Sequence, residues 1–206
     1  MRLSSVGELA DRLIAQAGDR RRFVAAIAGA PGSGKSTIAA ELCVEIGARG
    51  VKCAVVPMDG FHYDDAVLAE KGLSSRKGAP ETFDFAGLRT LLRRLREESG
   101  EVAIPLFDRS MELSRAAAAI VDGDTRIVLV EGNYLLLDEE PWRGLADMFD
   151  ASCYLDVPRP ELERRLLERW RKHGRAQDDA RRWVATNDLP NADRVIAHSR
   201  LPDIIL

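Results

Sequence analysis

The stretch Gly29-Ala30-Pro31-Gly32-Ser33-Gly34-Lys35-Ser36-Thr37 follows an apolar run of strand length, Phe23-Val24-Ala25-Ala26-Ile27-Ala28. Its glycines let successive backbone N–H groups turn inward on a phosphate, while Lys35 reaches the β and γ oxygens and Ser36 offers a hydroxyl to Mg²⁺. A helix that starts near Lys35 points its positive end at the same anion. A glycine-rich turn alone would not need Gly34-Lys35-Ser36 between a strand and a helix. Residues 29–37 therefore predict a nucleoside triphosphate site, with ATP and Mg²⁺ as the expected ligands.

Composition limits the remaining possibilities. With 206 residues, 46% of them hydrophobic, the chain can bury one substantial core, which predicts a single domain. The net charge of −3 excludes a global field that attracts nucleic acid or anionic membranes. The three cysteines form no C-x-x-C pair, and no uncharged run approaches the ~18 residues of a membrane span. We therefore expect a cytoplasmic protein with no nucleic-acid partner and no membrane insertion.

Strand-like and helix-like segments alternate along the chain, which predicts an α/β fold with a mainly parallel sheet. The stretch 59–84 is instead irregular and rich in Gly, Ser, Lys and Pro, a composition typical of a substrate loop. The expected strands cover 23–28, 52–56, 102–106, 127–130 and 152–157, with a short edge strand at 203–206. The expected helices cover 6–17, 37–46, 88–95 and 162–170.

Two carboxylates follow predicted strands, at the edge where open α/β sheets bind ligands. Glu131 ends the apolar run 127–130, and in phosphate-loop sites such a carboxylate holds Mg²⁺ directly or through water. Asp59 follows the second strand and could accept the proton of an attacking hydroxyl. The alternatives are a surface acid at a strand end for Glu131 and an ordinary turn aspartate before Gly60 for Asp59. We assign Glu131 and Ser36 to the metal, and Asp59 to general-base catalysis.

Four segments together resemble the phosphoribulokinase, uridine kinase and type I pantothenate kinase family. They are residues 29–37, Met58-Asp59-Gly60-Phe61-His62, Lys77-Gly78-Ala79-Pro80-Glu81-Thr82-Phe83-Asp84 and Val130-Glu131-Gly132-Asn133-Tyr134. Residues 131–138 and 187–192 look most like bacterial proteins named as fructose transport system kinases. The resemblance implies a three-layer P-loop NTPase fold, with a five-stranded sheet flanked by helices and an arginine-rich lid. It also implies ATP-dependent phosphorylation of an alcohol group on a small molecule.

By position, the resemblance implies that Asp59 is the base and Glu131 the metal-side carboxylate. It also places Arg76, Glu81 and Asp84 of the substrate loop near the acceptor, although such acids can merely face solvent. His62 follows the proposed base closely enough to touch the acceptor, but a lone histidine is more often structural.

The expected lid covers residues 161–182 and is dense in arginine. Positive charge over the transferring phosphoryl group stabilises its transition state. Most of these arginines should pair with glutamates at helical spacing, and we assign Arg169 first, then Arg165, to the phosphates. The resemblance weakens here, because Glu168-Arg169-Trp170 replaces the arginine-aspartate pair of uridine kinases. Asn187 and Asn191 resemble positions that approach adenine, with capping or turn roles equally open.

The acceptor is not decided by the residues. The resemblance favours a fructose-like sugar, while nucleosides and pantothenate stay open. A guanine reader and the third glycine of a dinucleotide site are both missing, which argues against a GTPase and an oxidoreductase. A non-catalytic nucleotide-sensing subunit of a sugar transport system is the remaining alternative. A homodimer is compatible with the sequence, and Trp142, Trp170 or Trp183 would mark its interface if exposed.

Overall fold

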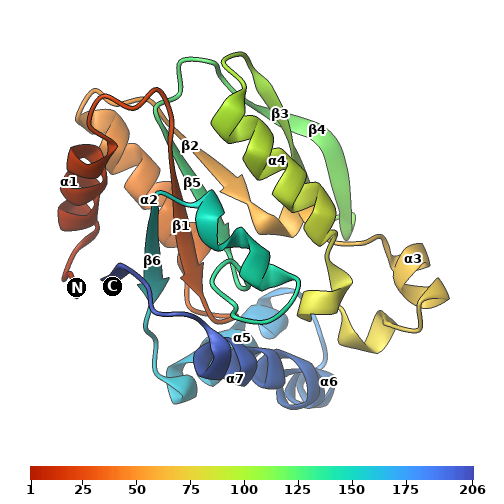
Figure 1. The fold of residues 1–206 in the computed structure, drawn as a ribbon. Helices are drawn as coiled ribbons and strands as arrows, with labels where there is room; N and C mark the ends of the chain where they lie inside the picture. Colours follow the sequence, from red (N-terminus) through yellow and green to blue (C-terminus); the bar gives the residue numbers. More distant parts are fainter.

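The computed structural model describes residues 1–206, and its main sheet contains five parallel strands in the order β2-β5-β1-β6-β7 (Figure 1). This confirms the predicted α/β fold and its mainly parallel sheet. The strands are β1 (Phe23–Gly29), β2 (Cys53–Pro57), β5 (Ile127–Gly132), β6 (Ala151–Leu155) and the short edge strand β7 (Ile204–Ile205).

Helices cover both faces of this sheet, so every residue of β1 except its terminal glycine carries a side chain into a packed layer. Alternate residues serve opposite layers: Val24 and Ala26 pack in one cluster, and Phe23 and Ala25 in the other. The first cluster includes α4 (Phe85–Glu97), α7 (Leu189–His198) and Leu162 of α5 (Arg159–Lys172). The second includes α1 (Val6–Ala17) and α2 (Lys35–Ala48). The result is the expected arrangement in three layers (Figure 1).

The expected strand at 102–106 is present, but it does not join the main sheet with the other expected strands. Strand β3 (Val102–Asp108) pairs antiparallel with β4 (Leu113–Val121), which the sequence analysis missed, to form a separate hairpin (Figure 1). Burial along β3 alternates at Val102 and Ile104 and its register shifts beside Pro105, which has no N–H to donate. The alanine run 116–119 in β4 has high helix propensity, which concealed the strand.

The C-terminal third supplies the expected lid region. Helix α5 leads through a short turn into α6 (Gln177–Trp183), and a π-helical turn, Val184–Asp188, connects α6 to α7. The substrate-loop stretch contains α3 (Asp65–Glu70) between short 3-10 turns. None of the helices combines the length and apolar character needed to span a bilayer.

Candidate active site

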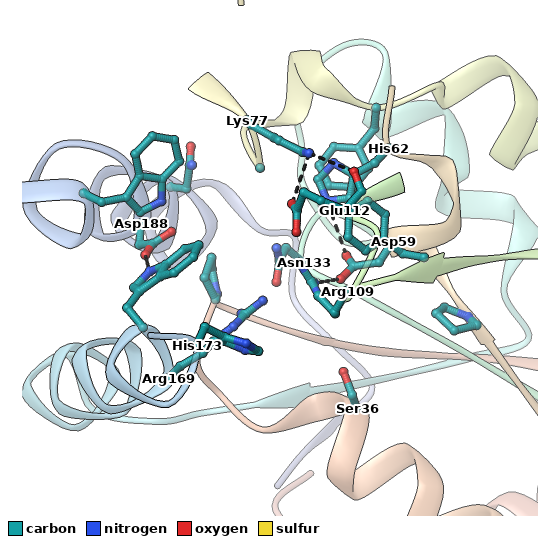
Figure 2. Close-up of a pocket in the computed structure, with 18 of the residues that line it drawn as sticks. Ser36, Asp59, His62, Lys77, Arg109, Glu112, Asn133, Arg169, His173 and Asp188 are labelled. Atoms are coloured by element: carbon teal, nitrogen blue, oxygen red, sulfur yellow. Dashed lines mark hydrogen bonds and ion pairs between the residues drawn. The ribbon is translucent and has the colours of Figure 1, made fainter. Parts of the chain in front are cut away.

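A cavity of about 1230 Å³ opens at the carboxyl ends of β1, β2 and β5. Sites for one drug-sized ligand usually measure roughly 300–1,000 Å³, so this cavity has room for two ligands. In Figure 2, Ser36 lies at its lower edge, Asp188 and Arg169 of the C-terminal helices on one side, and Asp59 and His62 on the other.

The phosphate loop forms the floor. Gly32 and Gly34 adopt φ values of +83° and +90°, a region that favours glycine. A Cβ on Gly29 would lie 2.6 Å from Ser33 Oγ, which is buried without a hydrogen-bond partner. Lys35 begins α2, so the helix N-terminus faces the cavity. This cradle fits a polyphosphate. Two residues of the predicted loop do not line the cavity: Ala30 is buried in the core, and Thr37 is exposed.

Glu131 and Ser36 lie together, as the metal assignment requires. Glu131 is the last residue but one of β5 and is 5% exposed, and Ser36 Oγ donates to its Oε1 over 3.1 Å. Burial raises the pKa of Glu131, and the positive charge of Lys35 opposes this. A hydroxyl and a buried carboxylate beside a phosphate cradle are the oxygen donors that Mg²⁺ prefers, so these residues fit that ion.

Asp59 lies on the opposite wall, in the 3-10 turn Met58–Phe61 that follows β2. This turn is pressed against β3, since a Cβ on Gly60 would lie 2.4 Å from the Pro105 carbonyl oxygen. Arg109, in the β3–β4 turn, donates to Asp59 Oδ2. Burial acts to raise the pKa of Asp59, but surrounding positive charge, including Arg109 and Lys35, outweighs it and lowers the pKa. Asp59 is therefore ionised, with Oδ1 left for another partner.

His62 packs between two phenylalanines in the same wall. Its ring centroid lies 4.0 Å from that of Phe83 and 5.0 Å from that of Phe107. Nε2 is 3.9 Å from Asp59 Oδ1, and Nδ1 is buried without a hydrogen-bond partner. Burial lowers the pKa of His62 to about 4, so the ring is neutral at neutral pH. His62 lines the cavity, where the prediction of an acceptor contact needs it.

The lid arginines divide into two kinds. Arg169 lines the cavity and makes no ion pair, while burial lowers its pKa. Arg165 instead binds Glu161 Oε1 over 2.7 Å and the Ser33 carbonyl oxygen over 3.0 Å, and it does not line the cavity. The structure therefore brings Arg169 to the site but engages Arg165 in supporting the phosphate loop from outside.

Arg175 also lines the cavity and is held by two indole rings. Its guanidinium carbon lies 4.2 Å from the Trp170 centroid and 4.8 Å from that of Trp183. Trp170 Nε1 donates to Asp188 Oδ2 over 2.6 Å, and burial raises the pKa of Asp188 (Figure 2). We call these four residues the indole clamp. Of the candidate interface tryptophans, Trp142 is core and the other two line the cavity, so none marks a separate exposed patch.

Three residues predicted near the acceptor do not line the cavity. Asp84 caps α4 by accepting from the Gly87 N–H over 2.9 Å. Glu81 lies 3.5 Å from Arg76 and 3.3 Å from Arg194 in ion pairs at the side of the substrate loop. Asp84 is engaged as a helix cap, and Arg76 and Glu81 are engaged in ion pairs. The structure therefore does not bring these three residues to the cavity.

Asn187 and Asn191 support the substrate loop. Asn187 donates to the Lys77 carbonyl oxygen over 2.8 Å and accepts from Asn191 Nδ2 over 3.4 Å. Asn191 lines the cavity with its Oδ1 buried and unpartnered. These contacts place Asn191 in the cavity lining beside the substrate loop, and the adenine role expected for it stays a prediction.

The sequence analysis missed several cavity residues. Arg109 and Glu112 come from the β3–β4 turn, which follows a predicted strand and could have been examined for polar side chains as Asp59 and Glu131 were. Lys77 and Asn133 lie inside the quoted family segments, but no spacing marked them. Lys77 Nζ lies 2.6 Å from Asp65 Oδ1 and 3.0 Å from Glu112 Oε1.

Comparisons with known proteins agree with this geometry. Residues 24–199 match the model of the phosphoribulokinase / uridine kinase family. A crystal structure from Silicibacter sp. TM1040, described as a "putative fructose transport system kinase", superposes with a TM-score of 0.94 at 41% identity, covering 99% of this chain and 100% of that one. The uncharacterized protein YggC of Escherichia coli is 36% identical over 91% of this chain and 78% of its own. A Schizosaccharomyces pombe protein named as a "putative uridine kinase" is 33% identical, over a match that covers 99% of this chain and 91% of that protein.

Proposed function

The chain belongs to the phosphoribulokinase / uridine kinase family, and we propose that it is an ATP-dependent kinase that phosphorylates an alcohol group of a small molecule, a fructose-like sugar or a nucleoside. One observation carries this proposal: Asp59 and Lys35 face the same cavity, near enough for each charge to shift the other's pKa. A phosphate-binding cation and a carboxylate with a free oxygen, held across one cavity, are what hydroxyl phosphorylation needs.

In this proposal the phosphate loop binds the triphosphate, and Ser36 and Glu131 hold Mg²⁺. When bound, Mg²⁺ neutralises charge on the β and γ phosphates. The acceptor hydroxyl lies beside Asp59, with Arg109 on Oδ2 orienting the carboxylate so that Oδ1 receives the proton. The acceptor oxygen bonds to the γ phosphorus, the bond from that phosphorus to the β–γ bridging oxygen breaks, and ADP leaves. Arg169 faces the cavity from the lid and lowers the energy of the charge that develops on the transferring group.

The first test removes the phosphate-binding cation. Lys35→Ala should abolish turnover, because the other lysine that lines the cavity, Lys77, is held in ion pairs with Asp65 and Glu112. Lys52→Ala is the matched control, since Lys52 pairs with Asp122 and Asp124 at the other end of β2. A Lys35→Ala enzyme with near-native phosphorylation would remove the phosphate loop from the mechanism.

The second test is an ADP-release screen over monosaccharides, nucleosides and pantothenate. Acceptor-dependent release that requires Asp59 supports the kinase. Tight ATP binding without release on any acceptor would favour the nucleotide-sensing subunit instead.

A further inference from the structure

The cations around the cavity differ in whether they have carboxylate partners. On the lid and phosphate-loop side, Lys35, Arg169 and Arg175 line the cavity and none makes an ion pair. On the opposite wall, Lys77 is bound by both Asp65 and Glu112, and Arg109 by Asp59 (Figure 2). Every free positive charge therefore lies on the side that would take a triphosphate.

We call the side of the cavity that carries Asp59, His62, Lys77 and Arg109 the acceptor wall, and neutral hydrogen-bonding side chains lie on it and beside it. His62 Nδ1, Asn133 Oδ1 and Asn191 Oδ1 are buried, lack partners and belong to residues that line the cavity. The His62 side chain is 6% exposed and Asn191 is 2% exposed. A buried polar atom without a partner costs about 1–3 kcal/mol, so several in one cavity indicate a ligand that pairs with them. Phe83 and Phe107 add apolar faces to the same wall.

We propose that the acceptor is an uncharged polyhydroxy compound of the sugar or nucleoside class, read by Asn133, Asn191 and His62 through its non-reacting hydroxyls. Carboxylate- and phosphate-bearing alcohols are rejected, because Lys77 and Arg109 are already neutralised inside the protein. This inference rests on the proposed function, since it identifies the acceptor of that same site, and it separates sugars and nucleosides from pantothenate.

Neutral and charged ligands would pair differently with the residues of the acceptor wall, and this difference is the physical reason for the expected selectivity. Hydroxyl groups can donate to the amide oxygens and exchange hydrogen bonds with the neutral imidazole. An anion placed there would lose its water, gain no unpaired cation from the acceptor wall itself and lie near Asp59, Asp65 and Glu112. Sites built to bond hydroxyls also discriminate strongly, because an unsuitable ligand leaves their polar atoms unpaired.

The test uses pairs of ligands that differ in charge on one scaffold: fructose and fructose 6-phosphate, uridine and its 5′-monophosphate, and pantothenol and pantothenate. Equilibrium binding is measured by calorimetry on the intact protein with Mg²⁺ and a non-hydrolysable ATP analogue. In each pair that binds, the uncharged member should bind at least tenfold more tightly. Tighter binding of the charged members, or no binding by any uncharged member while the ATP analogue binds, would overturn the proposal. Turnover is measured in parallel, so that an uncharged ligand that binds without being phosphorylated counts against the kinase and not against this inference.

Two sets of variants test the residues themselves. Asp65→Asn combined with Glu112→Gln frees Lys77 and should strengthen binding of the charged members by about tenfold to a hundredfold, the range of a hydrogen bond to a charged group. Glu70→Gln, at an exposed position of α3 with no ion pair, is the matched control. Asn133→Ala and Asn191→Ala should weaken the uncharged ligand about tenfold and leave binding of the ATP analogue unchanged. Unchanged affinity for charged ligands in the double variant, or for uncharged ligands in both alanine variants, would contradict the assignment.

Discussion

Mild acidification should destabilise this protein through His62. The pKa of His62 is about 4 in the folded protein because of burial, against 6.5 for an unperturbed histidine. The unfolded chain therefore binds a proton between these values that the folded protein does not, so the free energy of unfolding falls as the pH drops from 6.5 toward 4. Each pKa unit corresponds to about 1.4 kcal/mol, which puts the full difference at about 3 kcal/mol. About 2 kcal/mol of this should be lost by pH 5.

Urea denaturation at pH 7.5 and pH 5.0 measures this effect. The His62→Asn variant should start from a lower stability, because it leaves a gap between Phe83 and Phe107, but should lose about 2 kcal/mol less than the wild type on acidification. His198→Asn removes an exposed histidine and should follow the wild-type profile. Parallel profiles for wild type and His62→Asn would show that His62 is protonated as easily in the folded protein as in the unfolded chain, and would refute the reasoning.

Three further predictions concern the proposed chemistry. Asp59→Asn should lower kcat by about 10² to 10⁴ while leaving ATP binding largely intact, and a collapse of ATP affinity at constant kcat would move Asp59 to the metal shell. Glu131→Gln should raise the Mg²⁺ concentration needed for half-maximal activity about tenfold, and an unchanged Mg²⁺ titration would contradict its metal role. Asp188→Asn should disturb the indole clamp, changing tryptophan fluorescence and weakening binding of an ATP analogue about tenfold, because Arg175 loses its fixed position. If both measurements match the wild type, Asp188 does not position Arg175.

The nucleotide half of the cavity could be predicted because its residues follow the regular core. Glu131 of β5 pairs in register with Ile27 of the neighbouring strand β1, just before the phosphate loop begins at Gly29. Glu131 and the phosphate loop therefore lie at the same edge of the sheet. Parallel strands place their carboxyl ends at one edge of the sheet. Identifying the apolar runs correctly therefore also identifies the residues that meet at that edge. The spacing of residues 29–37 and the end of the run 127–130 were sufficient for this.

The lid shows what helical periodicity can and cannot predict. Arg165 and Arg169 are four residues apart, so both were expected on one face of the helix. They are also about 6 Å apart along its axis, at 1.5 Å per residue. Gly32 lies so close to α5 that a Cβ there would be 3.0 Å from Leu166 Cγ. Arg165 consequently meets the backbone of the phosphate loop, and only Arg169, one turn further, reaches the cavity.

The acceptor half could not be predicted because it depends on tertiary contacts that leave no periodic signal. Arg109 reaches Asp59 only because the β3–β4 hairpin packs on the turn at Gly60, through a close approach to the Pro105 carbonyl. Lys77 is fixed from three directions, by Asp65 of α3, Glu112 of the hairpin and the backbone bond from Asn187. Apart from the Lys77–Asp65 pair, which lies within residues 59–84, these contacts join segments that are distant in sequence, and all of them lie outside the main sheet. A change in the hairpin turn can therefore alter the charge of the acceptor wall without affecting the phosphate loop, which provides a physical route for members of one kinase family to accept different alcohols.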